Sequence, residues 1–444
     1  MESKPKILLI SPTSLDPQGK PIVQKKTYLP GLTLPHLAAI TPQNFEVTIV
    51  SETSQPIPFT EKWDIVGLTG MGGAGVTRAY QLAEEFRKSG ALVVMGGIAL
   101  TLFNKEETLS HADVVISGEA DESWVEFLHD YLDGNVKPSY TMKCVPDITK
   151  LPAPAYEKMD LKFYGFWRPV QATRGCPFSC SFCSVSEFFH RSYRKRPVEQ
   201  VIRDVRAAKK TGSKYIAFID DNIGVDFNYC KELWTALIPE KIIWISQCSL
   251  QIAEDEEMLD LAYRSGCRIL SFGVETLNTD SLNHIHKEWN DATDYSSRIR
   301  TIRSHGIEVS TEMILGLDGD DIDVFDRTFD FLMKNDISLP RIYILTPVPG
   351  TPMYQELKDE NRIIDEDIVK YTGGNVVYRP KSMSPQQLQD GYWSVYKRLY
   401  SLKNIYKRLR GNPAGLNKFM RLFLLGTNLV YRNHIQKGIT PGIV

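Results

Sequence analysis

TRGCPFSCSFCSV, residues 173–185, places Cys176, Cys180 and Cys183 within eight residues. A structural zinc ion and a ferredoxin-type cluster each use four protein ligands, so this triad is one ligand short of either. Three thiolates can hold three corners of a 4Fe–4S cluster and leave the fourth iron open to a small chelating molecule. The alternative is a zinc ion with a distant fourth ligand, for which His190 is the nearest histidine and lacks the usual paired spacing.

The chain around and after the triad alternates short apolar runs with helical patterns. Six strands are predicted at 169–175, 215–222, 242–249, 268–276, 308–316 and 341–350. Helical segments separate them at 197–212, 226–238, 254–266, 278–284, 291–305 and 321–335. This order predicts a partial (β/α)6 TIM-like barrel over residues 166–372, with its chemistry at the carboxyl ends of the strands.

The residues before the triad predict a separate α/β domain. Short β-branched runs lie at 6–11, 46–51, 64–69, 91–97 and 113–118, and an amphipathic helix is expected at 75–90. Alternation of this kind indicates a doubly wound parallel sheet, placed at residues 1–135. Residues 136–165 are rich in proline, which disfavours helices and strand interiors, and are expected to be a linker.

The C-terminal segment, residues 373–444, is expected to be helical. Its last part, 391–444, holds ten Lys and Arg residues and no Asp or Glu. Tyr396, Tyr400, Leu402 and Tyr406 recur at near-helical spacing among these cations. Such a basic amphipathic segment favours contact with an anionic membrane surface. The alternative is an ordinary helical cap over the barrel with a solvated basic face.

Composition excludes several classes of protein. The chain has 444 residues, 42% of them hydrophobic and 24% charged, and a net charge of −2, so there is no overall nucleic-acid signal. The seven cysteines do not form a disulfide-type framework, which favours a reducing compartment, and no signal peptide or membrane-spanning run is seen. We expect a cytoplasmic protein, peripheral to the inner membrane surface if the tail makes membrane contact.

The triad has the spacing CxxxCxxC with Phe182 in the aromatic slot, and it resembles the signature of the radical S-adenosylmethionine (SAM) superfamily. The resemblance implies a 4Fe–4S cluster on the three cysteines, SAM as the missing ligand, and cleavage of SAM to a 5′-deoxyadenosyl radical. It also implies SAM contacts at the ends of the second, third and fourth barrel strands. These candidates are Asp220, Asp221, Asn222, Gln247, Ser249 and Glu275. Polar strand-end turns are the alternative for each of them.

A doubly wound domain before such a barrel resembles the cobalamin-binding radical SAM enzymes. The stretches that carry this resemblance are 27–40, 69–80, 95–102 and 117–123. Three of them follow strands, at the edge where such sheets bind ligands. The implied cobalamin contacts are Thr69, Gly70, Met71, Gly72, Gly73, Gly96, Gly97, Gly118 and Glu119.

The chain departs from one pattern of cobalamin proteins, because none of its histidines follows an aspartate by two residues, as in Asp-x-His-x-x-Gly. Met71 or another residue of the loop 69–75 would then cover the lower face of the cobalt. The alternative is a degenerate scaffold that binds no cobalamin.

The sequence thus predicts a cobalamin-dependent radical SAM enzyme that methylates an unactivated carbon of a hydrophobic polycycle, as the bacteriochlorophyll and hopanoid members do. The radical would remove a hydrogen and methylcobalamin would supply the methyl group. An alternative is a non-methylating member that cyclises, oxidises or joins carbons, and a third reading is a sensor or scaffold. The expected partners are a hydrophobic substrate and a flavodoxin- or ferredoxin-type electron donor, and no nucleic acid.

Overall fold

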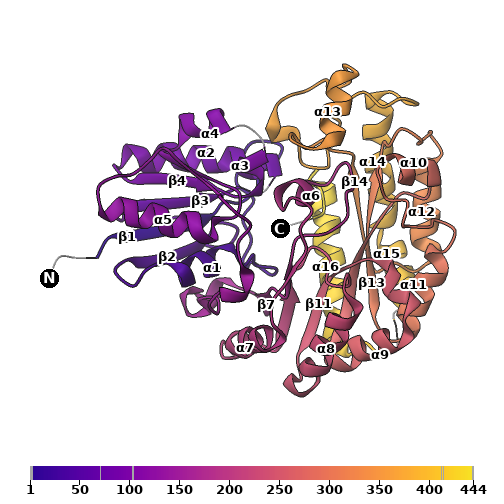
Figure 1. Cartoon of the computed structure of the whole chain (residues 1–444). Coiled ribbons are helices and arrows are strands. Elements are labelled where there is room, and N and C mark those ends of the chain that lie inside the picture. Colours follow the sequence, from indigo (N-terminus) through magenta and orange to yellow (C-terminus); the bar gives the residue numbers. More distant parts are fainter. Residues whose placement is uncertain (1–3, 71, 103–104, 412, 414, 443–444) are drawn as a thin grey trace. The chain divides into compact units, whose positions relative to one another are not determined.

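The computed structural model describes residues 4–442 except 71, 103–104, 412 and 414 (Figure 1). Contacts within the chain divide it into two compact units. Met1–Gly175 and Ser184–Ile219 belong to the first unit, and Cys176–Cys183 and Asp220–Ile443 belong to the second.

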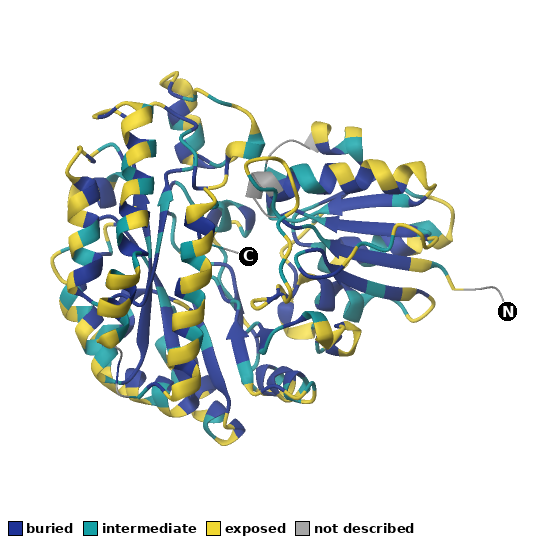
Figure 2. Cartoon of the chain, turned by 180° about the vertical axis from the view of Figure 1, so that it is seen from behind, coloured by how far each residue is buried: buried dark blue, intermediate teal, exposed yellow. Residues whose placement is uncertain are grey.

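The first unit contains a six-stranded parallel sheet with the order β2-β1-β3-β4-β5-β6. Its strands are β1 (Lys6–Ser11), β2 (Glu46–Ser51), β3 (Ile65–Thr69), β4 (Leu92–Gly96), β5 (Val114–Ser117) and β6 (Ser139–Thr141). The helices are α1 (Thr33–Ile40), α2 (Gly72–Lys88), α3 (Ile98–Leu102), α4 (Lys105–His111) and α5 (Ala120–Leu132). The central strands are apolar and buried (Figure 2), as expected for a sheet covered on both faces. The order 2-1-3-4-5 is that of flavodoxin-like folds, whose ligand site lies where the strand order reverses, here between β1 and β3.

The segment expected to be a linker contributes to this sheet. β6 lies inside 136–165 and pairs with β5 at the edge. An edge strand of three residues avoids the prolines on either side of it, which explains why proline content alone did not reveal it. The rest of this segment includes short 3-10 turns.

The second sheet has the order β14-β13-β12-β11-β10-β7. β7 (Trp167–Val170) and β10 (Tyr215–Phe218) form a parallel pair in the first unit, together with α7 (Val198–Lys209), α6 (Ser184–Phe188) and the short hairpin of β8 (Thr173–Arg174) and β9 (Arg194–Lys195). The second unit contributes β11 (Ile243–Cys248), β12 (Cys267–Glu275), β13 (Glu308–Leu315) and β14 (Leu339–Ile344), which are parallel to one another. Its helices here are α8 (Phe227–Leu237), α9 (Glu256–Ser265), α10 (Thr279–His284), α11 (Tyr295–Ser304) and α12 (Val324–Lys334). The predicted fold class, α/β with parallel sheets, is confirmed.

C-terminal helices cover the free edge of β14. α14 (Pro385–Leu399) and α16 (Lys418–Gln436) contact this strand, and α15 (Leu402–Arg410) packs against both helices. α13 (Pro352–Asp359) instead reaches the cysteine loop, where the Met353 amide donates to the Ser181 carbonyl. The Tyr396 hydroxyl donates to the carbonyl of Ile342 and accepts from its amide, and Tyr400 donates to the carbonyl of Pro340. Arg408 is fully buried and donates to the carbonyls of Ile337 and Ser338. Backbone groups of an exposed edge strand invite pairing with another chain, and these side chains occupy them instead.

Candidate active site

The cysteine loop brings three thiols that form no disulfide together in the second unit. Cys180 is buried, Cys176 and Cys183 are half-buried, and the amide of Cys183 donates to the carbonyl of Cys180 at 3.1 Å. Each thiol interacts electrostatically with the other two. Burial raises the pKa of Cys176 to about 11 and that of Cys180 to about 12, so both are protonated at neutral pH until a metal binds.

The end of β12 carries a buried ion pair beside this loop. Lys287 Nζ lies 2.6 Å from Glu275 Oε1 and 2.8 Å from the carbonyl oxygen of Gly273, and the two charged side chains are 7% and 9% exposed. Burial opposes the charged form of Lys287, but Glu275 and the nearby Cys180 more than offset it and raise its pKa. Glu275 has φ of +62°, a left-handed conformation that costs a residue with a side chain about 1–3 kcal/mol.

Among the other strand-end candidates, Asp221 interacts with the same loop. Asp221 interacts electrostatically with Cys176, and Asp220 is 1% exposed. Asn222 Oδ1 accepts from the amide of Ser249 at 3.1 Å, which ties the β10 and β11 ends together. Gln247 is exposed on β11.

A row of polar side chains crosses the sheet below these ends. Arg341 on β14 donates to Glu312 on β13 and to Ser271 on β12, both at 2.6 Å. Gln247 Nε2 lies 3.4 Å from Glu312 Oε1 and extends the row to β11. The sequence analysis missed Glu312, Arg341 and Lys287. Glu312 and Arg341 could have been identified from the sequence, because each is a charged residue inside an otherwise apolar strand pattern. No such pattern marks Lys287.

The glycine-rich edge of the first sheet has a different character. Gly70, Gly96 and Gly97 meet there, since the Gly70 amide donates to the Gly96 carbonyl and a Cβ on Gly97 would lie 3.2 Å from the Gly70 backbone. A Cβ on Gly118 would lie 2.8 Å from the Met142 side chain. Thr69 ends β3, and Gly72 and Gly73 begin α2, while Met71 lies outside the described residues. All three contacts are within the chain, so its own packing explains why glycine occupies these positions. The glycines themselves add no side chains to this edge.

Glu119, predicted at that edge, joins a buried charged network in the first unit. Its two oxygens lie 2.8 Å from Arg174 Nη1 and 2.8 Å from Arg194 Nη2. Arg174 also donates to Asp121 at 2.8 Å, and Asp121 lies 2.9 Å from His36 Nε2. Arg174 directly precedes the cysteine motif, so this network fixes the chain just before the thiols.

The chain is similar to known proteins along nearly its whole length. The model of the radical SAM superfamily matches residues 170–332, and that of a domain of unknown function (DUF4070) matches residues 351–419. Bacteriochlorophyllide d C-12(1)-methyltransferase of Chlorobaculum tepidum is 31% identical, over 99% of this chain and 95% of the relative. The chain belongs to this family of radical SAM enzymes.

Two further comparisons agree with this assignment. Bacteriochlorophyllide d C-8(2)-methyltransferase from the same organism is 29% identical to the enzyme over 90% of each chain. The solved structure of the radical SAM methyltransferase TsrM from Kitasatospora setae, with cobalamin and a 4Fe–4S cluster bound, shares the fold with a TM-score of 0.65. That comparison covers 88% of the enzyme and 85% of TsrM at 17% identity.

The cysteine loop fits a cluster better than a single ion. Thiolates around one zinc ion are about 3.8 Å apart, as Zn–S bonds of 2.3 Å in a tetrahedron require. Among the residues that the structure describes, the three thiols are not a group of ligand atoms within 4.8 Å of one another, whereas His284, Asp318 and Glu356 are. The wider spacing of the thiols suits a multi-iron cube, and Phe182 between them is half-buried.

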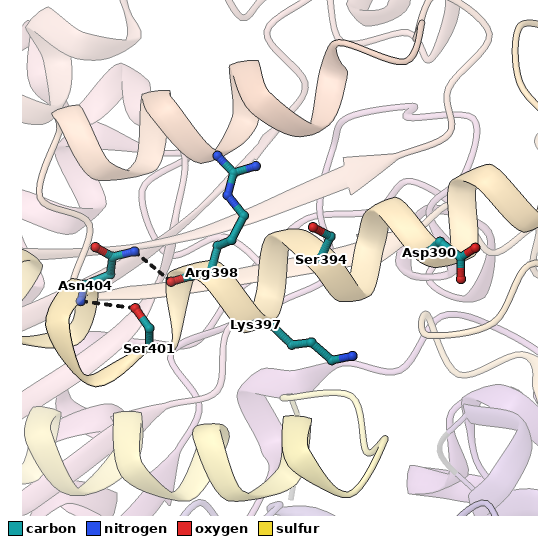
Figure 3. Close-up of a pocket in the computed structure, with 6 residues that line it drawn as sticks. All are labelled: Asp390, Ser394, Lys397, Arg398, Ser401 and Asn404. Atoms are coloured by element: carbon teal, nitrogen blue, oxygen red, sulfur yellow. Dashed lines mark hydrogen bonds between the residues drawn. The ribbon is translucent and has the colours of Figure 1, made fainter.

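A surface groove on α14 and the following turn is a poor alternative site. Figure 3 shows its lining residues Asp390, Ser394, Lys397, Arg398, Ser401 and Asn404. The hydrogen bonds drawn there are local, because Asn404 donates from its side chain to the Arg398 carbonyl and from its amide to Ser401 Oγ. The lining contains no cysteine thiol, and its polar groups lie at the surface of the helix.

Proposed function

We propose that this enzyme is a cobalamin-dependent radical SAM methyltransferase that modifies an unactivated carbon of a hydrophobic polycycle, with a tetrapyrrole as the favoured substrate. The observation that carries the proposal is the triad of mutually interacting thiols in a chain that aligns over 99% of its length with a bacteriochlorophyllide methyltransferase. When bound, the cluster, SAM and cobalamin would supply the radical and the methyl group.

The roles of the chain's own residues follow from their places. Cys176, Cys180 and Cys183 would hold the cluster once deprotonated. The strand-end group of Asp220, Asp221 and Asn222 would bind SAM, because it lies at the carboxyl end of a strand, where barrels of this type bind ligands, and Asp221 interacts with Cys176. The half-exposed row of Glu312 and Arg341 offers polar groups for orienting a substrate.

The first sheet would hold cobalamin at the edge formed by the ends of β3, β4 and β5. The flavodoxin-like strand order supports this, because its switch point lies beside β3.

The decisive experiment is anaerobic purification from cells fed cobalamin, followed by cluster reconstitution and incubation with SAM and bacteriochlorophyllide-type tetrapyrroles. We expect stoichiometric corrinoid, 5′-deoxyadenosine and a methylated product that carries the methyl group of labelled SAM. Cys180→Ala should lower 5′-deoxyadenosine formation at least 100-fold, roughly 2.7 kcal/mol or more in activation free energy. Cys144→Ala, which changes an exposed cysteine of the first unit, is the matched control. A protein that cleaves SAM but carries no corrinoid would contradict the methyltransferase assignment.

We also propose a peripheral membrane contact through the C-terminal helices and a flavodoxin- or ferredoxin-type electron donor. No helix among the described residues is long and apolar enough to cross a membrane. The exposed face of α16 nevertheless carries an apolar stripe at helical spacing, made of Phe419, Leu422, Leu425, Leu429 and Val430. Lys418 and Arg421 flank it, and α15 adds exposed Leu402 and Tyr406 beside Lys403 and Lys407. Tyr396 and Tyr400, in contrast, are buried against β14, so this part of the tail acts as a helical cap.

Vesicle sedimentation tests the contact. The full chain should bind vesicles that contain anionic phospholipid more strongly than neutral ones, and salt should weaken the binding. Leu422→Ser with Leu425→Ser should reduce the bound fraction about tenfold, because both side chains lose their apolar insertion. Val23→Ser with Leu29→Ser, equally exposed residues of the first unit, should not. Equal binding of the two double variants would overturn the proposal.

A further inference from the structure

Lys287 is held at the end of β12 by two acceptors. Its ammonium donates to the carbonyl of Gly273 and to Glu275 Oε1, and its side chain is 7% exposed. The ammonium also lies 5.0 Å from the centre of the Trp289 ring. A lysine ammonium has three donors, and for the third no protein acceptor is found among the described residues.

Two contacts place this lysine against the cysteine loop. The Ser181 amide donates to the carbonyl of Ile285 at 3.1 Å, and the Phe178 ring stacks on Trp289 at 4.1 Å between ring centres. In the sequence, Cys180 lies between Phe178 and Ser181, and Lys287 lies between Ile285 and Trp289. The ammonium accordingly interacts electrostatically with Cys180 and Cys183.

The backbone of β12 is distorted where it holds the lysine. The register with β13 shifts between Gly273 and Glu275, and Glu275 adopts the left-handed conformation. A Cβ on Gly273 would lie 2.3 Å from Glu275 Oε1 and 2.9 Å from Lys287 Nζ, so a side chain at this position would displace the ion pair. Strained, buried ion pairs add little to stability compared with apolar residues of the same size, which points to a role other than folding.

We propose that Lys287 is the resident countercharge of the iron–sulfur cluster and that Glu275 positions it. This inference rests on the proposed function, because it requires the cysteine triad to hold a cluster. Three thiolates and a cluster that accepts an electron build up negative charge in a buried site. A fixed cation beside that site stabilises the reduced state more than the oxidised one, so it raises the reduction potential.

The test is a redox titration of the reconstituted enzyme in the absence of SAM, in which electron paramagnetic resonance monitors the reduced cluster. Iron and sulfide are measured in every sample. Lys287→Met should shift the midpoint to more negative potential, and Lys287→Arg, which keeps the charge, should stay near the wild type. Glu275→Gln keeps an acceptor for the ammonium but removes the opposing charge, so it should shift the midpoint to more positive potential. Lys370→Met, at an exposed lysine paired with Asp365, is the matched control.

The outcomes distinguish a failure of the cluster assignment from a failure of the Lys287 inference. A wild-type protein that takes up no iron and sulfide would end the cluster assignment, and the Lys287 inference would fall with it. Clusters with equal midpoints in the wild type, Lys287→Met and Glu275→Gln would overturn the countercharge alone. Weaker SAM binding by Glu275→Gln at an unchanged midpoint would reassign this carboxylate to the ribose of SAM. If Lys287→Met fails to fold, Lys287→Gln, which is neutral but keeps a hydrogen-bond donor, should show the same shift to more negative potential.

Discussion

Two buried charged clusters adjoin the cysteine motif in sequence or in space, and they differ in how many charged partners each group has. In the first unit, Arg174 and Arg194 face Glu119 and Asp121, so two cations meet two carboxylates in a network with three contacts of 2.8 Å. In the second unit, Lys287 faces Glu275 alone, on a distorted strand end and beside two thiols. Burial of an ion pair therefore does not distinguish a structural role from a functional one.

The distinction lies in geometry. In the arginine network Glu119 binds two guanidinium groups and Arg174 binds two carboxylates, all in ordinary backbone conformations, and such shared contacts fix two segments firmly. The lysine pair instead combines strain, a spare donor and neighbouring metal-ligand candidates, which is the pattern expected where a charge serves chemistry. If this comparison is right, changes in the first cluster alter stability, and changes in the second alter the cofactor.

The largest effect is expected for Glu119→Ala. This change leaves Arg194 without its carboxylate and Arg174 with only Asp121, and breaking a buried pair typically costs about 3–5 kcal/mol. Urea denaturation should show this loss, and hydrogen exchange over residues 114–132 should localise it to the first unit. Glu122→Ala, at an exposed carboxylate of the same helix, should change stability by about 0.5 kcal/mol or less. A stable Glu119→Ala protein that only loses cobalamin would reverse the comparison and restore Glu119 as a cofactor contact.

A smaller effect is expected from acid. Burial opposes ionisation of Asp121, but the hydrogen bond from His36 and the charge of Arg174 outweigh it and hold its pKa well below the usual 3.8. A carboxyl whose pKa is lower in the folded state contributes stability above its unfolded pKa and loses it as the pH falls further. Stability of the first unit should therefore decline below about pH 4, by roughly 1–3 kcal/mol from this group. Unfolding midpoints measured from pH 6 to 3 should fall less steeply for Asp121→Asn; parallel slopes for the two proteins would contradict this account.

The sequence allowed most of the fold to be predicted, because the strands and helices of both sheets have strong apolar periodicity. Predicted and observed ends differ by a few residues, as for β12, expected at 268–276 and found at Cys267–Glu275. β6 was missed because three residues between prolines carry no periodic signal. The triad of cysteines was visible because its spacing is fixed by local chain geometry.

Partners that meet only through the tertiary fold could not be predicted. Nothing in HIHKEWN, residues 284–290, indicates that its lysine turns back to the strand end at Glu275, 12 residues earlier, and faces Cys180, which is distant in sequence. The two carboxylate candidates, Glu119 and Glu275, were placed correctly at strand ends, but their arginine and lysine partners were not foreseen. The SAM and cobalamin roles assigned to the strand-end residues remain predictions.

The smallest effect concerns the glycines at the edge of the first sheet, where packing and cofactor binding make different demands. Gly97 has φ of +116° and no room for a Cβ beside the Gly70 backbone, whereas Gly134 has φ of +70° and nothing within 4 Å. Gly97→Ala should therefore cost about 1–2 kcal/mol, and Gly134→Ala about 1 kcal/mol or less. Thermal unfolding without cobalamin measures the packing cost, and corrinoid content after growth on cobalamin measures the cofactor cost. If Gly97→Ala unfolds at the same temperature as Gly134→Ala but loses corrinoid, Gly97 serves cofactor binding. If Gly97→Ala is already less stable without cobalamin, the close contact between the backbones of Gly97 and Gly70 requires the glycine.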